Sequence, residues 1–178
     1  MSHEVEIGRG KRGRRAYTLD DIALVPARRT RDPEDVNVGW QIDAYHVDLP
    51  LMAAPMDSVM SPETAIAFGR LGGIGVLDLD GLWTRYEDPE PILDQIAHLG
   101  EEESIATLQR VYSEPIKPAL ITERLTQQRE AGVVVDGKLS PQRVQQPWRA
   151  VVDAGVDQVI IHGLPGSAEH GAWRREPL

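Results

Sequence analysis

The sequence predicts an α/β fold in which parallel strands alternate with helices, and three observations point to it. Short apolar runs are separated by longer segments with helical periodicity. Several of those segments open with a Ser-Pro or Asp-Pro-Glu sequence and close with glycine, as helices commonly do. The 178 residues, 41% of them hydrophobic, are enough for one domain with its own core.

Residues 49–79 carry the clearest strand–helix–strand unit. Residues 49–54 predict a strand buried on both faces, and residues 74–77 predict a second one. Ser61-Pro62-Glu63 opens the helix between them, and Gly72-Gly73 ends it. Such a unit crosses over right-handed into a parallel sheet. The turn at residues 55–58 therefore follows the first strand, at the edge where α/β folds place their ligands.

The segment before this unit begins with basic residues and continues with apolar, acidic and basic residues together. Residues 1–15 are rich in arginine and predict a solvated, flexible tail, with an arm that contacts nucleotide phosphate or a neighbouring subunit as the alternative. Residues 19–26 predict an extended segment with a turn at Asp20-Asp21. Weak alternation over residues 36–42 predicts an accessory strand across the bottom of the sheet.

The segment after the unit predicts an enlarged crossover of about two helices. Asp88-Pro89-Glu90 opens the first helix, which ends at Gly100, and apolar residues at 105, 108 and 111 mark a short helical piece. Glu101, Glu102 and Glu103 predict a solvated first turn and no metal site, because neighbouring side chains on a helix point apart. Residues 119–131 predict a further helix.

The remaining strands are predicted near the C-terminus. Residues 133–135 predict the third strand and residues 156–162 the fourth. Between them, Ser140-Pro141 predicts the start of a helix that buries Val144, Trp148, Val151 and Val152 and ends at Gly155. Residues 163–178 predict a loop.

Composition excludes several classes of function. A net charge of −9 gives no general reason to expect a nucleic acid or an anionic membrane as partner. No apolar run is long enough for a membrane span or a signal peptide, so we expect a cytoplasmic protein. The absence of cysteine excludes disulfides, thiolate metal sites and a cysteine nucleophile on this chain.

Two motifs in order resemble a known family. Residues 54–59 (APMDSV), with the helix and residues 72–75 (GGIG) after them, resemble the first barrel strand and turn of the IMP dehydrogenase/GMP reductase family. Residues 18–26 (TLDDIALVP) resemble its N-terminal signature, and the likeness covers about residues 16–170. The short crossover is similar to the branches of the family that lack an inserted regulatory domain.

The resemblance implies the N-terminal half of a (β/α)8 barrel, with about four βα units over residues 16–178, because a complete barrel needs about 200–250 residues. A small doubly wound parallel sheet is the alternative. Half a barrel has two unpaired sheet edges and needs another element to cover them. We therefore expect this chain to be the N-terminal portion of a longer enzyme.

The resemblance also implies a reaction. It points to a purine nucleotide oxidoreductase, with oxidation of IMP to XMP by NAD as the first choice and reduction of GMP by NADPH as the second. The family uses a cysteine thiolate that this chain lacks, so the chain alone is expected to be inactive. A monovalent cation site and a homotetramer would come with the longer form. The alternative is a non-catalytic remnant that binds a nucleotide or another subunit.

Five residues are candidate contacts by this resemblance, and none is catalytic or metal-binding. Ala54, Met56 and Asp57 lie where the family contacts the nucleotide, with Met56 against the base or ribose and Asp57 supporting the turn. Plain packing at a strand end is the alternative role of Met56. His162 and Gly163 lie where the family has an aspartate at the nicotinamide ribose, so this cofactor contact departs from the family pattern. A hydrogen-bonded packing role is the alternative for His162.

Overall fold

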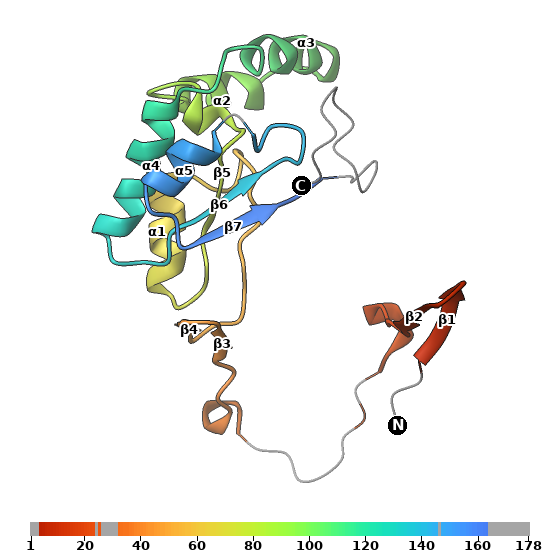
Figure 1. Ribbon diagram of the computed structural model, residues 1–178. Coiled ribbons are helices and arrows are strands. Elements are labelled where there is room, and N and C mark those ends of the chain that lie inside the picture. Colours follow the sequence, from red (N-terminus) through yellow and green to blue (C-terminus); the bar gives the residue numbers. More distant parts are fainter. Residues whose placement is uncertain (1–3, 24, 26–31, 146, 164–178) are drawn as a thin grey trace. The chain divides into compact units, whose positions relative to one another are not determined.

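The computed structural model describes residues 4–23, 25, 32–145 and 147–163. The chain divides into two compact units, Met1–Asn37 and Val38–Leu178, which are described separately (Figure 1). Most of the loop predicted at residues 163–178 and part of the segment predicted at residues 19–26 lie outside the described residues. Within the described ranges, no helix combines the length and apolarity needed to cross a membrane.

The first unit contains a β-hairpin where a flexible tail was predicted. Strand β1 (Glu4–Gly8) pairs antiparallel with β2 (Lys11–Arg14), so this part of residues 1–15 is regular. The chain can reverse tightly because Gly10 adopts a φ of 70°, which side chains disfavour. The charges that suggested a tail remain in solvent and partly pair, with Arg12 Nη1 3.4 Å from Glu4 Oε2.

Two single-turn helices complete the first unit, η1 (Leu19–Asp21) and η2 (Pro33–Asp35). The turn predicted at Asp20-Asp21 is confirmed by η1. Both the backbone N–H and the hydroxyl of Thr18 donate to the Asp21 carboxylate, at 2.9 and 3.0 Å. These bonds lower the pKa of Asp21.

The second unit opens with a hairpin of β3 (Trp40–Ile42) and β4 (Tyr45–Val47). The accessory strand predicted over residues 36–42 is thus confirmed for its last three residues. Val47 is buried in a cluster with Ile74 and Val76, and Ile42 packs against the same cluster. The hairpin therefore covers one face of the main sheet.

The main sheet contains β5 (Val76–Asp78), β6 (Asp136–Leu139) and β7 (Gln158–Ile161), parallel and adjacent in chain order. A parallel bridge between Met52 and Ile74 adds a first strand position before β5. The four consecutive parallel positions confirm the predicted α/β class. The order is that of a barrel wall, in which each strand pairs with the next.

The strand predicted at residues 49–54 is wrong in length and burial. Three backbone bonds tie it to the segment before β5, from Leu49 N to Gly72 O at 2.9 Å, from Ala53 N to Ile74 O at 2.9 Å and from Ile74 N to Leu51 O at 3.0 Å. Leu51 is 54% exposed and Met52 42%. The cause is an edge position, because among the described residues it has a strand neighbour on one side alone.

Five helices connect these strands: α1 (Pro62–Arg70), α2 (Glu90–Ala97), α3 (Glu101–Val111), α4 (Pro118–Glu130) and α5 (Trp148–Asp153). The predicted start of α1 is confirmed, since the Ser61 hydroxyl accepts the Thr64 N–H at 3.1 Å. The enlarged crossover between β5 and β6 contains three helices instead of about two. Gly72, Gly132 and Gly155 follow α1, α4 and α5 with φ of 93°, 72° and 71°.

Two predictions near β6 are wrong in position. The strand is at Asp136–Leu139, whereas the apolar run 133–135 leads from the α4 terminus into the core and buries Val135. The helix predicted at Ser140-Pro141 is a turn, in which the Arg143 and Val144 N–H groups donate to the Ser140 carbonyl at 3.1 and 3.0 Å. Pro147 has no N–H to continue that turn, so α5 begins only after it.

The helices that pack on the sheet all lie on one face. Leu77, Leu79 and Leu139 form the main core with Ile121 and Leu125 of α4, and residues of α1 and α5 join the same cluster. Figure 1 shows α1, α4 and α5 together on one side of β5, β6 and β7. A doubly wound sheet would carry helices on both faces. The described part therefore has the layering of an open barrel wall, and the barrel is not closed.

Candidate functional site

The candidate site lies at the carboxyl ends of the parallel strands, where Asp57 joins three loops. The Asp57 carboxylate accepts two hydrogen bonds at Oδ2, from Leu82 N–H at 2.9 Å and from the Tyr112 hydroxyl at 2.5 Å. Its other oxygen, Oδ1, is buried without a hydrogen-bond partner among the described residues. The turn after the first strand position is thereby fixed to the loop after β5 and to the end of α3.

Gly81 makes this close approach possible. A Cβ atom at position 81 would lie 2.2 Å from Asp57 Oδ1 and 2.7 Å from Oδ2, far inside van der Waals contact. The residue has a φ of −84°, so its backbone would accept any side chain. Position 81 is therefore glycine because the Asp57 carboxylate leaves no space for a Cβ atom.

Tyr112 contacts Asp57, and Arg85 lies against the Tyr112 ring. We call this edge of the sheet, with the loops that follow its strands, the rim. Burial, and then the hydrogen bond to Asp57, raise the pKa of Tyr112, which keeps its hydroxyl a donor. Arg85 is 2% exposed as a residue, and its guanidinium carbon lies 5.7 Å from the Tyr112 ring centroid. It donates from Nε and Nη2 to the Asp80 carbonyl, at 3.2 and 2.9 Å, and from Nη1 to the Glu114 carbonyl.

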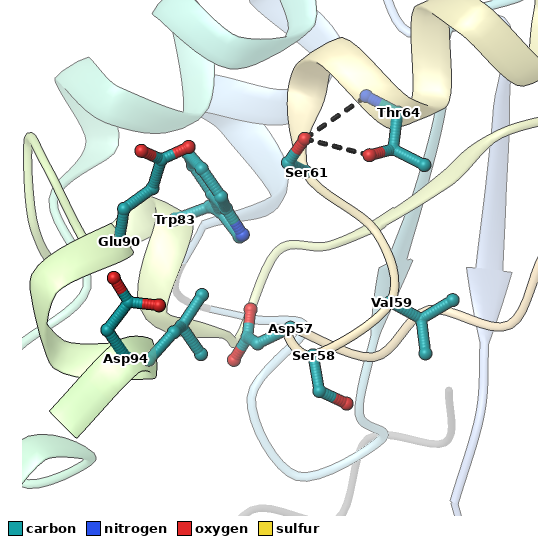
Figure 2. Close-up of a pocket in the computed structure, with 9 residues that line it drawn as sticks. Asp57, Ser58, Val59, Ser61, Thr64, Trp83, Glu90 and Asp94 are labelled. Atoms are coloured by element: carbon teal, nitrogen blue, oxygen red, sulfur yellow. Dashed lines mark hydrogen bonds between the residues drawn. The ribbon is translucent and has the colours of Figure 1, made fainter. Parts of the chain in front are cut away.

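A cavity of about 390 Å³ lies beside Asp57, between the start of α1 and α2 (Figure 2). Its wall includes three carboxylates, Asp57, Glu90 and Asp94, together with Trp83 and the hydroxyl of Ser61. The Trp83 indole N–H is buried without a partner in the described structure. The carboxylates make this cavity unfavourable for a phosphate group.

A charged cluster occupies the inner face of the sheet, which is the face opposite the helices. Side chains alternate along a strand, so Asp78 follows Val76 on that face, while Leu77 and Leu79 enter the helical core. Lys138 is the register partner of Asp78, and its Nζ lies 3.2 Å from Asp78 Oδ1 and 3.7 Å from Asp80 Oδ2. Burial raises the pKa of Asp78, against the lowering effect of the Lys138 charge.

Sequence reasoning missed Lys138 and Tyr112 as parts of the rim. Lys138 could have been found from a correctly placed β6, since the strand register alone sets it opposite Asp78. Tyr112 reaches Asp57 across 55 positions in the chain, and no local pattern indicates that contact.

A buried acid lies two positions before Lys138 in β6. Asp136 is fully buried, between Val76 and Gln158 in the strand register, and neither carboxylate oxygen has a hydrogen-bond partner among the described residues. Burial raises its pKa to about 7. The carboxyl group is therefore protonated over much of the acidic range, where an exposed aspartate would be ionised.

The residues expected from the family resemblance are distributed along this rim. Asp57 is in the network above, Ala54 is exposed, and Met56 is 49% exposed at the same turn. The Met56 N–H donates to the Ala54 carbonyl at 2.9 Å, and the Met56 carbonyl accepts the Met60 N–H at 2.8 Å. The Met56 side chain therefore faces solvent, and the backbone of Met56 is held in a tight turn.

His162 and Gly163 follow β7 directly. The His162 N–H donates to the Leu139 carbonyl at 3.0 Å, and the side chain is exposed. A Cβ atom at position 163 would lie 2.8 Å from Pro141 Cδ, so this residue packs against the loop after β6. Glu101, Glu102 and Glu103 are exposed in the first turn of α3, as the predicted solvated turn requires.

Comparison with known proteins gives one family. The model of the IMP dehydrogenase / GMP reductase domain matches residues 16–170. An uncharacterized oxidoreductase of Mycolicibacterium smegmatis is 42% identical over 98% of this chain, and one of Mycobacterium tuberculosis is 41% identical over the same share. The inosine-5'-monophosphate dehydrogenase of Methanocaldococcus jannaschii is 41% identical over 36% of this chain.

A solved structure gives the same result. The crystal structure of an IMP dehydrogenase/GMP reductase-like protein from Corynebacterium glutamicum superposes with a TM-score of 0.78 at 42% identity, over 94% of this chain and 46% of that one. The two mycobacterial proteins are likewise matched over 48% of their length. This chain thus spans about half the length of the relatives it matches.

Proposed function

We propose that this chain, which belongs to the IMP dehydrogenase/GMP reductase family, supplies the first half of a (β/α)8 barrel that acts on a purine nucleotide. The relatives matched over nearly the whole chain are named oxidoreductases, which supports redox chemistry for the complete barrel. Oxidation of IMP to XMP with NAD is the first choice. Reduction of GMP with NADPH is the second.

The fixed turn at residues 55–58 is the observation that carries this proposal. It lies at the carboxyl edge of a parallel sheet, where barrel enzymes bind their substrates, and it is held by the Asp57 network instead of by local packing alone. Met56 is presented to solvent in the middle of that turn. We infer that Met56 contacts the base or ribose, with Ala54 beside it and Asp57 holding the turn.

The cofactor would be held by this half only in part. His162 and Gly163 follow β7 at the same edge, and an exposed imidazole beside a glycine backbone is suited to contact a nicotinamide ribose by hydrogen bonding. When bound, a nicotinamide cofactor supplies hydride transfer. The residues of this chain contribute binding and orientation.

A non-catalytic role is the alternative, and one observation favours it for the chain by itself. None of its 178 residues is a cysteine, so the thiolate that the family implies for the covalent step cannot come from this chain. Nucleotide binding or association with another barrel subunit would remain. Turnover by the completed barrel supports the oxidoreductase, and nucleotide binding without turnover supports the non-catalytic role.

The Met56 contact can be tested in a barrel completed by fusing this chain to the C-terminal half of the Corynebacterium glutamicum relative. Met56→Arg should weaken IMP or GMP binding by at least about 2 kcal/mol, roughly 30-fold, because the larger cation overfills the space for the base. Ala54→Ser should be neutral or strengthen binding by about 0.5–1.5 kcal/mol through an added hydrogen bond. Isothermal titration calorimetry measures both.

Leu71→Arg is the matched control, since Leu71 is 74% exposed and follows the last residue of α1, at the opposite end of that helix from the turn. It should leave nucleotide affinity unchanged. Equal affinities for the parent and the Met56→Arg protein would mean that Met56 only packs, and the assignment of the turn would be lost.

A further inference from the structure

A second cavity lies between the start of α4 and the loop that follows β6. Its volume is about 420 Å³, and Arg85, Tyr112, Glu114, Ile116, Arg143 and Pro147 contribute to its wall. It differs from the cavity beside Asp57 in charge, because its wall contains two arginines and one carboxylate. That composition favours an anion.

The two arginines are close enough to repel each other. Burial lowers the pKa of Arg85 most, and the positive charge of Arg143 lowers it further, while Asp80 acts in the opposite direction. The described residues place no carboxylate in an ion pair with either guanidinium. A bound anion would relieve this repulsion.

The hydrogen bonds of Arg85 hold it in place without neutralising it. All its partners are carbonyl oxygens, of Asp80 and of Glu114. The Glu114 carboxylate itself lies 4.0 Å from Lys117 Nζ. Arg143 is exposed, and no described hydrogen bond restrains its side chain, so it is able to close on a ligand.

The apolar part of the wall adds to the effect of the charges. Pro115, Ile116, Pro118 and Pro147 line the cavity beside the guanidinium groups. An apolar wall lowers the local dielectric constant and strengthens a charge-assisted hydrogen bond between arginine and an oxyanion.

The loop that carries Arg143 also packs against the residue that follows His162 after β7. Arg143 belongs to residues 140–145, in which Pro141 packs against Gly163, with a Cβ at position 163 only 2.8 Å from Pro141 Cδ. Gly163 and His162 are the residues expected at the nicotinamide ribose. In a dinucleotide, the phosphate groups follow directly on that ribose.

We propose that the cavity at Arg85 and Arg143 binds the phosphate groups of the dinucleotide cofactor, with Arg143 closing over them. This inference rests on the proposed function for its choice of ligand, and on the cavity for its choice of chemistry. Arg85 supplies a fixed positive charge at the base, and Arg143 supplies an exposed guanidinium fork that matches a phosphate oxygen pair.

Titration calorimetry on the full chain tests the site with inorganic pyrophosphate as the probe. The parent chain should bind pyrophosphate saturably, and Arg143→Gln should weaken that binding at least tenfold. Arg143→Lys should give an intermediate affinity, because it keeps the charge but loses the fork. Arg70→Gln, at an exposed arginine at the end of α1, is the control and should match the parent.

The outcomes separate this inference from the proposed function. Absence of saturable pyrophosphate binding, or equal binding by the parent and Arg143→Gln, overturns the cavity assignment and leaves the function of the completed barrel intact. Competition of pyrophosphate by NAD or NADP supports the dinucleotide. Competition by IMP alone means that the site holds the substrate phosphate, and the dinucleotide assignment is then wrong.

Discussion

Gly81→Ala is expected to destabilise the fold by roughly 2–4 kcal/mol. The new methyl group would lie 2.2 Å from Asp57 Oδ1, so the half-buried carboxylate has to move. Movement weakens its bonds to the Leu82 N–H and the Tyr112 hydroxyl, and hydrogen bonds to a charged group contribute about 1.5–3 kcal/mol. A lower denaturant midpoint by urea titration measures the loss.

Gly100→Ala provides the matched comparison. A Cβ atom at position 100 meets no atom within 4 Å, and its φ of −68° suits alanine. The same change in backbone entropy applies to both variants, so Gly100→Ala should remain within about 0.5 kcal/mol of the parent. Equal midpoints for the two alanine variants would show that Asp57 is not held as described.

Asp136→Asn is expected to remove a large part of the pH dependence of stability. Burial raises the pKa of Asp136 from 3.8 to about 7. The folded state therefore keeps a proton that the unfolded chain releases, and stability falls as the pH rises from about 4 to about 7. A difference of about three in pKa corresponds to a loss on the order of 4 kcal/mol above pH 7.

The asparagine side chain at position 136 carries no charge at any pH, so the Asp136→Asn protein should be more stable than the parent at pH 8. Its stability should also change less between pH 4 and pH 7 than that of the parent. Asp153→Asn, at an exposed position on α5, should follow the parent curve and serves as the control. Parallel melting-temperature profiles for the parent and Asp136→Asn would mean that Asp136 ionises normally.

The helix starts could be predicted from the sequence because their cause is local. Ser61 bonds to the N–H of Thr64 three residues on, and proline at the next position needs no bond. The glycines after α1, α4 and α5 are equally local, since each adopts a φ that other residues avoid. The parallel class follows from the order of these elements.

The errors concern features that tertiary neighbours decide. Residues 49–54 are apolar enough for a buried strand, but burial depends on a second neighbour that the described chain does not provide. The third strand was predicted at the apolar run 133–135, whereas β6 contains Asp136 and Lys138 on the inner face of the sheet, where Lys138 pairs with Asp78. Ser140-Pro141 carries a helix start, and Pro147 stops the helix from forming there.

The site was predictable only as far as its motif extends. The turn at residues 55–58 could be placed from the strand before it and the capped helix after it. Its fixation by Tyr112 and Gly81 joins residues that are distant in the chain, and sequence patterns do not indicate such contacts. The arginine cavity is likewise assembled from the segments after β5, α3 and β6 and from the start of α4.

Catalytic turnover by the isolated chain and by the completed barrel tests the central claim most directly. The claim is that this chain forms the nucleotide rim of a purine nucleotide oxidoreductase whose nucleophile comes from the other half. The isolated chain should neither reduce NAD with IMP nor oxidise NADPH with GMP, and the barrel completed with a relative's C-terminal half should catalyse one of these reactions. Turnover that follows the isolated chain through purification would contradict the claim, as would an inactive completed barrel that is folded and binds the nucleotide.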